Sequence, residues 1–325
     1  MPSSTGRTPV ILVLMGGPDA EREVSLSSGR EVAAALRASG RFTVVDQVID
    51  RPTIFELKSL ASDCRADAVF PVLHGSWGEG GPLQELLEQL NLPYVGSQPR
   101  PAALAMDKMQ TKALVSVEGV PTPPAQELDI ASRCSIKPPL VLKPVDDGSS
   151  VDMRICRNEA EVAAARKALH PRRGRLMAEA YIQGREITAG IVLDEPLPLI
   201  EIIPAVEYYD YQAKYSRDDT RYVIDPDLPA GIAERCLEIA MTAYRTLGCR
   251  DIARVDIMLD GSRPWFLELN TMPGFTTHSL VPMAARRRGV EMPELCARLA
   301  WHALERSAVR QASRSAGAAS ARMAR

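Results

Sequence analysis

The sequence contains no segment that is both long and apolar enough to serve as a membrane span or a secretory signal. The N-terminus is polar, and the apolar run that follows it, Val10 to Met15, is only six residues long. A membrane-spanning helix needs about 20 such residues, and the core of a signal peptide also needs a longer run. We therefore expect a cytoplasmic protein without a membrane partner.

The chain also lacks an excess of charge of either sign. Its formal net charge is -2, from 39 basic and 41 acidic residues. Nucleic acids are bound by strongly basic surfaces, so no nucleic-acid partner is expected. The basic stretch 307–325 is rich in Ala, Ser and Arg. This composition favours a disordered tail; the alternative is an arm that binds nucleic acid or a membrane surface.

Paired cysteine motifs are absent as well. The six cysteines are scattered, none forms a C-x-x-C, and none has a histidine at zinc-binding spacing. This pattern argues against zinc and dithiol sites and predicts reduced, mostly buried thiols. The cysteines are Cys64, Cys134, Cys156, Cys236, Cys249 and Cys296.

What is present is an α/β pattern in a chain of 325 residues, which is long enough for two or three units. In the first hundred residues, apolar strands alternate with helices. Such alternation predicts a parallel sheet whose ligands gather at the carboxyl ends of the strands. Strands are expected at 10–15, 42–49 and 67–73, helices at 22–39 and 82–90, and glycine-containing turns at 16–17 and 75–81.

Two further units follow. The second is expected to contain one helix at 101–117, strands at 140–143 and 176–182, and a helix at 161–169. The third is expected to contain strands at 187–193 and 199–203, a helix at 230–247, and two facing strands at 253–259 and 265–270. The predicted boundaries are 1–100, 101–185 and 186–306, followed by the tail.

The segment ARVDIMLDGSRPWFLELN predicts a β-hairpin whose turn is centred on Ser262. With that centre, two polar pairs face each other across the strands and project from one face, because side chains alternate along a strand. These pairs are Arg254 with Asn270 and Asp256 with Glu268. The apolar residues expected on the opposite, core-facing side are Val255, Ile257, Leu267 and Leu269.

The pairing of Asp256 with Glu268 predicts a metal site. Like charges directly opposite each other destabilise a sheet unless something neutralises them. Two carboxylates and the amide oxygen of Asn270 are hard ligands suited to Mg²⁺. On the hairpin alone, a solvated face balanced by Arg254 is an equal alternative. The loop TMPGFTTHSL, which brings hydroxyls and backbone N–H groups back to the same end, favours the metal site.

Seven motifs, in this order along residues 10–305, resemble those of the D-alanine–D-alanine ligases, a family of the ATP-grasp class. They are MGGPDAEREVSLSSG, LHGSWGEGGPLQ, AMDKMQTK, LVLKPVDDGSSV, YYDYQAKY, ARVDIMLD and ELNTMPGFTTHSLVP. The resemblance implies a three-domain α/β fold, in which an N-terminal parallel-sheet domain adjoins two α+β domains that enclose ATP. It also implies ATP-dependent joining of two D-alanines through D-alanyl phosphate, for peptidoglycan precursor synthesis.

The resemblance assigns an ATP site to the second unit and the start of the third. Lys108 and Lys143 would bind the α- and β-phosphates as point charges. The small-residue loop Gly148-Ser149-Ser150 would close over the γ-phosphate, since exposed N–H groups cradle anions. The hinge Glu179-Ala180-Tyr181-Ile182 would bind adenine, and Glu186 would bind the ribose. Two Mg²⁺ or Mn²⁺ ions would lie at Asp256, Glu268 and Asn270.

The resemblance also assigns the substrate residues. Glu21 would bind the ammonium group of the first D-alanine, and His74 would lie near its carboxylate. Arg254 and the N–H of Gly274 would form the oxyanion site. The remaining assignments are Ser149 and Tyr215 to a link with Glu21, Lys214 to the transferred phosphate, and Ser279 and Leu280 to the carboxylate of the second D-alanine. A homodimer is expected.

Three positions depart from the family pattern. Asp152 stands where the family usually has Gly, Gly80 where Asp is usual, and Ala180 where Lys is common. These departures bear on ATP affinity and rate more than on the class of reaction.

Three other functions remain open at this point. A ligase that forms D-alanyl-D-lactate, or one for another D-amino acid, would share most of the motifs. A different ATP-grasp ligase would not be expected to contain THSL and AEREVS. A non-catalytic ATP-grasp regulator would be expected to have lost metal or oxyanion residues, yet Asp256, Glu268, Asn270 and Arg254 are all present.

Overall fold

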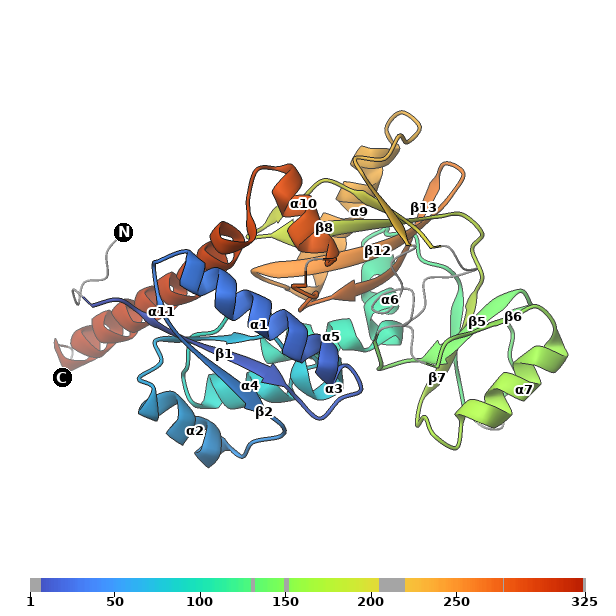
Figure 1. The fold of residues 1–325 in the computed structure, drawn as a ribbon. Coiled ribbons are helices and arrows are strands. Elements are labelled where there is room, and N and C mark those ends of the chain that lie inside the picture. Colours follow the sequence, from blue (N-terminus) through green and yellow to red (C-terminus); the bar gives the residue numbers. More distant parts are fainter. Residues whose placement is uncertain (1–6, 130–131, 149–151, 205–219, 277, 324–325) are drawn as a thin grey trace.

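The structure is a computed structural model that describes residues 7–129, 132–148, 152–204, 220–276 and 278–323, with the backbone alone beyond residue 309. It contains three sheets that follow one another along the chain (Figure 1). Figure 1 places the six-stranded sheet between the N-terminal sheet and the small four-stranded sheet. Among the described residues, no helix combines the length and apolar character needed to cross a membrane.

The N-terminal sheet is parallel, as predicted, with strand order β2-β1-β3. Its central strand β1 (Val10–Gly16) is buried along its whole length, because sheet neighbours and helices cover both faces. The neighbouring strands are β2 (Thr43–Ile49) and β3 (Ala68–Pro71). The helices are α1 (Arg22–Ala38), α2 (Ile54–Asp63), α3 (Gly75–Gly78) and α4 (Pro82–Gln89).

Helix α2 is absent from the elements expected from sequence. It begins at a capping box in which the Thr53 hydroxyl accepts from the Glu56 N–H and the Glu56 carboxylate accepts from the Thr53 N–H. A Thr-x-x-Glu pattern is a recognised helix start, so the signal was present in the sequence.

The next helical region is broken in two, whereas one helix was expected at 101–117. Helix α5 (Pro99–Met106) ends at Asp107, which is extended, and α6 (Lys108–Val117) begins directly after it. The Asp107 carboxylate caps α6 by accepting from the Gln110 N–H at 2.9 Å. The break places Lys108 in the first turn of α6, where the helix dipole disfavours a cation. This unfavourable position indicates that Lys108 serves a site.

The four-stranded sheet is antiparallel and has the order β4-β7-β5-β6. Helix α7 (Glu159–Leu169) packs its buried Val162 and Leu169 into the core of this sheet. Strands β4 and β6 were not expected from sequence, because each is short. The strands are β4 (Ala125–Leu128), β5 (Leu140–Pro144), β6 (Arg154–Cys156) and β7 (Leu176–Ala180).

The largest sheet has the order β11-β10-β8-β12-β13, with β9 paired to β8. Helix α9 (Ile232–Leu247) covers one face and buries Ile239 and Tyr244 against β8 and β12. Residues at the β10 end share a core with β1, α1 and the C-terminal helices, which joins this sheet to the N-terminal one. The strands are β8 (Arg185–Val192), β9 (Glu195–Pro196), β10 (Ile200–Ile203), β11 (Arg221–Ile224), β12 (Ile252–Asp260) and β13 (Arg263–Asn270).

The predicted residue pairs of the β12–β13 hairpin are confirmed, but the turn and the strand register near it differ from the expected ones. Arg254 pairs with Asn270 and Asp256 with Glu268. The turn is shorter than the expected 260–264, since Asp260 pairs with Arg263 and leaves only Gly261 and Ser262 between the strands. A bulge after Asp256 restores the predicted register, because Ile257 pairs with Phe266 and so skips Leu267.

Because of the bulge, one residue expected in the core is not buried there. Leu267 was expected to be buried with Val255, Ile257 and Leu269. Instead Phe266 takes the buried position, and Leu267 turns toward a cleft of about 910 Å³ together with Met258. One extra residue on a strand moves a side chain to the other face because the side-chain period is two.

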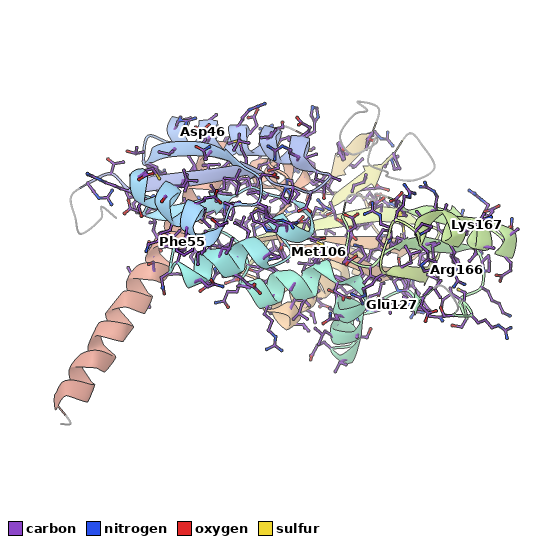
Figure 2. The ribbon with its side chains drawn as sticks, turned by 90° about the horizontal axis from the view of Figure 1, so that it is seen from below. Asp46, Phe55, Met106, Glu127, Arg166 and Lys167 are labelled. Carbon is purple, nitrogen blue, oxygen red and sulfur yellow. The ribbon has the colours of Figure 1, made fainter. Side chains whose placement is uncertain are left out.

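The chain ends in α10 (Leu280–Arg287) and α11 (Met292–Met323). The backbone of α11 continues as a helix through most of 307–325, where a disordered tail was expected; the Ala-rich composition favours a helix. Figure 2 shows this end of α11 running out from the body, far from Glu127 and Arg166 at the opposite end. The buried residues of α11 within the described side chains run from Leu295 to Ala303.

Arg306, the residue directly before the basic stretch, is bound to the body of the protein. Its guanidinium forms a two-pronged ion pair with the fully buried Asp251 and donates to the Tyr94 carbonyl at 2.9 Å. Asp251 also accepts from the Gly96 N–H at 2.8 Å and contacts His302 at 2.9 Å. Burial opposes the charged carboxylate, but these partners outweigh burial and lower the pKa of Asp251. The cluster therefore ties α11 to the N-terminal unit and to the start of β12.

Arg306→Ala is expected to lower the free energy of unfolding at neutral pH by about 2 kcal/mol, because a buried carboxylate loses charge-assisted hydrogen bonds. Since the folded pKa of Asp251 is depressed, its stabilising contribution is present above the ordinary carboxylate pKa and is lost as pH falls through the folded value. Urea unfolding at several pH values measures both effects. Deletion of 310–325 is the control and should leave the unfolding free energy nearly unchanged.

Candidate active site

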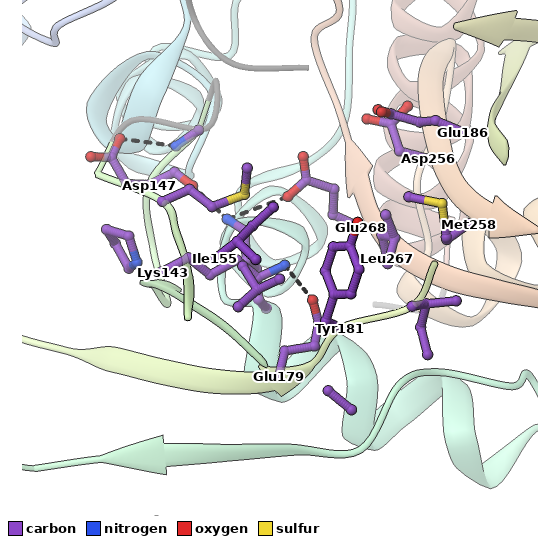
Figure 3. Close-up of a pocket in the computed structure, with 17 residues that line it drawn as sticks. Lys143, Asp147, Ile155, Glu179, Tyr181, Glu186, Asp256, Met258, Leu267 and Glu268 are labelled. Atoms are coloured by element: carbon purple, nitrogen blue, oxygen red, sulfur yellow. Dashed lines mark hydrogen bonds and ion pairs between the residues drawn. The ribbon is translucent and has the colours of Figure 1, made fainter. Parts of the chain in front are cut away.

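A cleft of about 910 Å³, open to solvent, lies between the four-stranded and six-stranded sheets. In Figure 3, Lys143 and Asp147 lie on one side of the view, and Glu186, Asp256 and Met258 on the other. Its lining includes all the described residues that the sequence assigned to ATP: Lys108, Lys143, Glu179, Tyr181, Ile182 and Glu186. The apolar part of the lining consists of Val141, Pro144, Met153, Ile155, Ala180, Ile182, Met258 and Leu267.

Two buried lysines share one buried acid at the base of this cleft. The Lys143 ammonium lies 2.7 Å from Glu179, and Lys112 pairs with the other carboxylate oxygen of Glu179. Burial alone would raise the pKa of Glu179, but the two ammonium groups lower it below its ordinary value. Burial would lower the pKa of Lys143, and Glu179 and Glu268 raise it. Glu179 and Lys143 are therefore both charged at neutral pH. Burial lowers the pKa of Lys112, and the charge of Glu179 offsets this only in part. Lys143 thus brings a buried cation to the wall of the cleft, which suits phosphate.

Glu179 was expected to contact adenine, but its carboxylate is engaged by the lysines. Glu179, Tyr181 and Ile182 of this hinge all line the cleft. Lys112 was missed from the sequence, although a signal existed. It follows Lys108 by four residues, and residues at this spacing share a helix face.

Lys108 lies where the two walls of the cleft approach each other. Its ammonium donates to the Asp147 backbone carbonyl and lies 3.6 Å from the Glu268 carboxylate on β13. The side chain is buried. Lys108 therefore links the segment after β5 to the acidic strand pair.

The predicted acidic face exists on β12 and β13, and each acid has a cation beside it. Arg254 forms a two-pronged ion pair with Asp256, with N–O distances of 2.9 and 2.7 Å. The Thr188 hydroxyl donates to the same carboxylate at 2.8 Å. Thr188 was not identified from sequence, although it follows Glu186 by two residues on β8 and so shares its face. Arg254 and Lys108 thus balance the like-charge pair.

A second cleft of about 510 Å³ adjoins the first. Four residues line both: Lys108, Asp147, Gly148 and Glu268. The second cleft is also lined by Glu21, Glu79, Arg254, Asn270 and Thr271. The N-terminal unit therefore meets the larger cleft here.

Gly148 explains how these units come so close. A Cβ at this position would lie 2.9 Å from the Glu21 carboxylate, so a larger residue would push the acid away. Nearby, the Ser76 hydroxyl donates to the Asp146 carbonyl at 2.8 Å. Two contacts from the N-terminal unit therefore reach the segment that follows β5.

His74 and Glu79 form a buried pair, 4.0 Å apart, of which Glu79 lines the second cleft and His74 does not. Burial lowers the pKa of His74 and, together with the nearby Glu21 charge, raises the pKa of Glu79 well above its ordinary value. Glu79 accepts from the N–H groups of Gly75 and Met272. Within the described structure His74 Nε2 has no hydrogen-bond partner. Glu79 was not identified from sequence, because its place in the cleft wall depends on a contact with Met272, which is distant in the chain.

Three other assigned residues lie in the loop before α10 and at its start. The Ser279 hydroxyl accepts from the Thr276 N–H at 2.9 Å, and a Cβ at Gly274 would lie 2.8 Å from that hydroxyl. The Leu280 side chain is part of the apolar core, so only its backbone N–H, in the first turn of α10, can face a ligand. These residues and His74 are not among those that line the second cleft. Ser149, Lys214 and Tyr215 lie outside the described residues.

The departure at Gly80 is accommodated by the fold. A Cβ at this position would collide with the Ser76 carbonyl, so the aspartate usual in the family would need a different local backbone. Ala180 lines the first cleft without adding charge.

Two antiparallel sheets that close on a cleft, with lysines on one wall and carboxylates on the other, define the ATP-grasp class of ligases. Family models give the narrower assignment: D-ala D-ala ligase N-terminus matches residues 47–97, and D-ala D-ala ligase C-terminus matches residues 122–300. The chain belongs to the D-alanine–D-alanine ligase family.

Individual relatives agree with this assignment. The chain is 43% identical to a D-alanine–D-alanine ligase of Bordetella avium over 294 residues, which cover 87% of this chain and 91% of the relative. It is also 43% identical to that of Nitrosomonas europaea, over 88% of this chain and 94% of the relative. A ligase structure from Bacillus anthracis, complexed with ATP, matches with a TM-score of 0.81 and 31% identity, over 94% of this chain and 99% of that one.

Proposed function

We propose that the two adjoining clefts catalyse the ATP-dependent ligation of two D-alanines to D-alanyl-D-alanine, in the cytoplasm, for peptidoglycan precursor synthesis. The main observation in support of this proposal is that the two clefts share part of their lining. Lys108, Asp147, Gly148 and Glu268 line both clefts, so a phosphate in the larger cleft can reach a carboxylate in the smaller one. Family membership supports the same reaction.

The larger cleft is proposed to bind ATP. Lys108 and Lys143 hold its phosphates, Tyr181 and Ile182 the adenine, and Glu186 the ribose. The buried ammonium of Lys143 in the wall of this cleft supports this orientation, because buried cations attract the triphosphate more strongly than solvated ones.

The smaller cleft is proposed to bind the first D-alanine, with its ammonium at Glu21 and its carboxylate toward His74. The carboxylate oxygen attacks the γ-phosphorus, ADP leaves, and D-alanyl phosphate forms. This step is needed because a carboxylate has oxide as its leaving group, whereas an acylphosphate has phosphate.

The second D-alanine then attacks through its neutral amine, with its carboxylate at Ser279 and the Leu280 N–H. Phosphate leaves, and the amine proton is lost to solvent or base. Arg254 and the Gly274 N–H are proposed to stabilise the tetrahedral oxyanion. Ser149, Lys214 and Tyr215 are proposed to complete the site: Ser149 and Tyr215 link with Glu21, and Lys214 reaches the transferred phosphate.

The acidic face fits a divalent metal. Asp256 and Glu268 are opposed across the strands and line the ATP cleft, and Asn270 adds an amide oxygen. Within the described residues, no group of three His, Cys, Asp or Glu side chains is placed to hold a metal, so two carboxylates and one amide would depend on phosphate and water oxygens. When bound, Mg²⁺ or Mn²⁺, as two ions, would offset phosphate charge.

Incubation of the purified protein with ATP, Mg²⁺ and D-alanine tests the proposed function. ADP, phosphate and the dipeptide should form in equal amounts. ATP hydrolysis without dipeptide, or dipeptide without ADP, would contradict it.

Three further proposals have their own tests. Light scattering tests the homodimer, and cell fractionation tests the location in the cytoplasm. Limited proteolysis tests the domain boundaries near 100 and 185, which separate the three sheets.

The second substrate is expected to be an amine rather than a hydroxy acid. D-alanine is mostly ammonium at neutral pH, so dipeptide formation should rise as pH increases above neutrality and more amine is free. Competition between D-alanine and D-lactate at several pH values measures this preference. Tyr215→Phe should keep the pocket shape yet let D-lactate compete better. A wild-type preference for D-lactate at neutral pH would instead assign the chain to depsipeptide synthesis.

A further inference from the structure

Asp152 occupies a backbone position that explains why glycine is usual there. Its φ is +57°, in the left-handed region that most residues avoid and that Gly adopts freely. Asp and Asn tolerate this region better than other side chains. The substitution of Gly by Asp therefore preserves the backbone and adds a negative charge.

The added charge is paired with one arginine in particular. Arg173 Nε donates to the Asp152 carboxylate at 2.7 Å. The same guanidinium places its Nη1 2.8 Å from the Asp147 carboxylate. Arg173 therefore bridges Asp147 and Asp152, which lie on either side of residues 149–151. Arg172 also reaches Asp152, at 3.1 Å, but its side chain is 57% exposed against 28% for Arg173.

Asp147 is where this bridge meets the site. It lines both clefts, and its backbone carbonyl accepts from the Lys108 ammonium. Its own carboxylate accepts from the Gly148 N–H at 2.9 Å. Arg173 contacts the carboxylate of Asp147, and Lys108 contacts the backbone carbonyl of the same residue. Arg173 therefore holds in place the residue that contacts Lys108.

The bridge also removes an electrostatic conflict. Asp147 lines both clefts and lies near the Glu21 charge, so without Arg173 its carboxylate would oppose the binding of phosphate there. Isolated surface ion pairs contribute little, but this guanidinium contacts two carboxylates, and the Asp152 side chain is only 12% exposed. A guanidinium presents five donors in a rigid planar fork and so holds two carboxylates in a defined geometry, whereas a lysine ammonium is a flexible point charge.

We propose that Arg173 is a positioning residue for the ATP phosphates, which holds Asp147 and Gly148 beside Lys108 by bridging Asp147 and Asp152. The negative charge of Asp152 is then neutralised by Arg173 and does not disturb the phosphate site. This inference rests on the proposed ATP site and adds to it a pair of residues that act without contacting the nucleotide.

Calorimetric titration of the whole protein with ATP and with adenosine tests the bridge. Arg173→Ala is expected to weaken ATP binding about tenfold, the effect of about one lost charge-assisted hydrogen bond. Adenosine binding should change less than twofold, because adenosine carries no phosphate. In turnover, the KM for ATP should rise more than kcat falls. Arg172→Ala is the matched control and should change ATP binding less than twofold.

Asp152→Asn gives a second test that does not depend on the folding of Arg173→Ala, since Asn tolerates the same backbone region. It should weaken ATP binding, and the double variant should be no worse than Arg173→Ala alone, as expected for partners in one interaction. Unchanged ATP affinity in both single variants, equal losses for ATP and adenosine, or additive losses would each overturn the bridge. Wild-type protein that binds no ATP would instead overturn the proposed function.

Discussion

Glu268→Gln is expected to lower turnover by about 10³-fold while leaving the fold intact. The variant keeps the size of the side chain and its place opposite Asp256 on β13. It removes one of the two charges proposed to hold the divalent metal, and it removes the acid that lies 3.6 Å from Lys108. The loss should therefore appear in kcat and in the dependence of rate on Mg²⁺ concentration.

Two measurements separate the metal role from the lysine role. Mn²⁺ binding followed by electron paramagnetic resonance should weaken in Glu268→Gln in the presence of ADP. Asp260→Asn, at the far end of the same hairpin and exposed, is the matched control and should change neither turnover nor Mn²⁺ binding. Turnover like that of the wild type at saturating Mg²⁺ would rule out the metal assignment.

Local pattern predicted much of the fold and the facing acids of the β12–β13 hairpin, whereas the other site residues were assigned by resemblance to the family. Buried strands such as β1, the helix α1 and the facing of Asp256 and Glu268 follow from periodicity and turn chemistry within a few residues. Short edge elements such as β4 and β6 carry too few residues for a pattern to be read.

Features that depend on long-range contacts could not be predicted. The bulge that turns Leu267 into the ATP cleft depends on the exact length of the turn and on core packing of Phe266. The pairing of Lys112 with Glu179 joins α6 to β7, and the binding of Arg306 to Asp251 joins α11 to β12. In each case the partner is distant in sequence, so neither residue alone indicates the interaction.

Arg254→Ala is expected to lower kcat by about 10²–10³-fold, the usual effect of removing one oxyanion donor. Arg254 lies at the wall of the second cleft and is held by Asp256 through two hydrogen bonds. Asp256 thus orients the guanidinium before the oxyanion forms, which is the preorganisation that such catalysis needs. ATP affinity should change little, because Arg254 does not line the larger cleft.

The ion pair of Arg254 with Asp256 also predicts how divalent metal binding should change in Arg254→Ala. Removal of Arg254 leaves Asp256 with the Thr188 hydroxyl but without its cation, so divalent metal binding should become tighter rather than weaker. Arg254→Lys should recover only part of kcat, since an ammonium cannot reproduce the two-pronged contact. Steady-state kinetics with ATP and D-alanine, combined with Mn²⁺ titration, distinguish the alternatives. A fall in ATP affinity with kcat unchanged would place Arg254 in nucleotide binding instead of at the oxyanion.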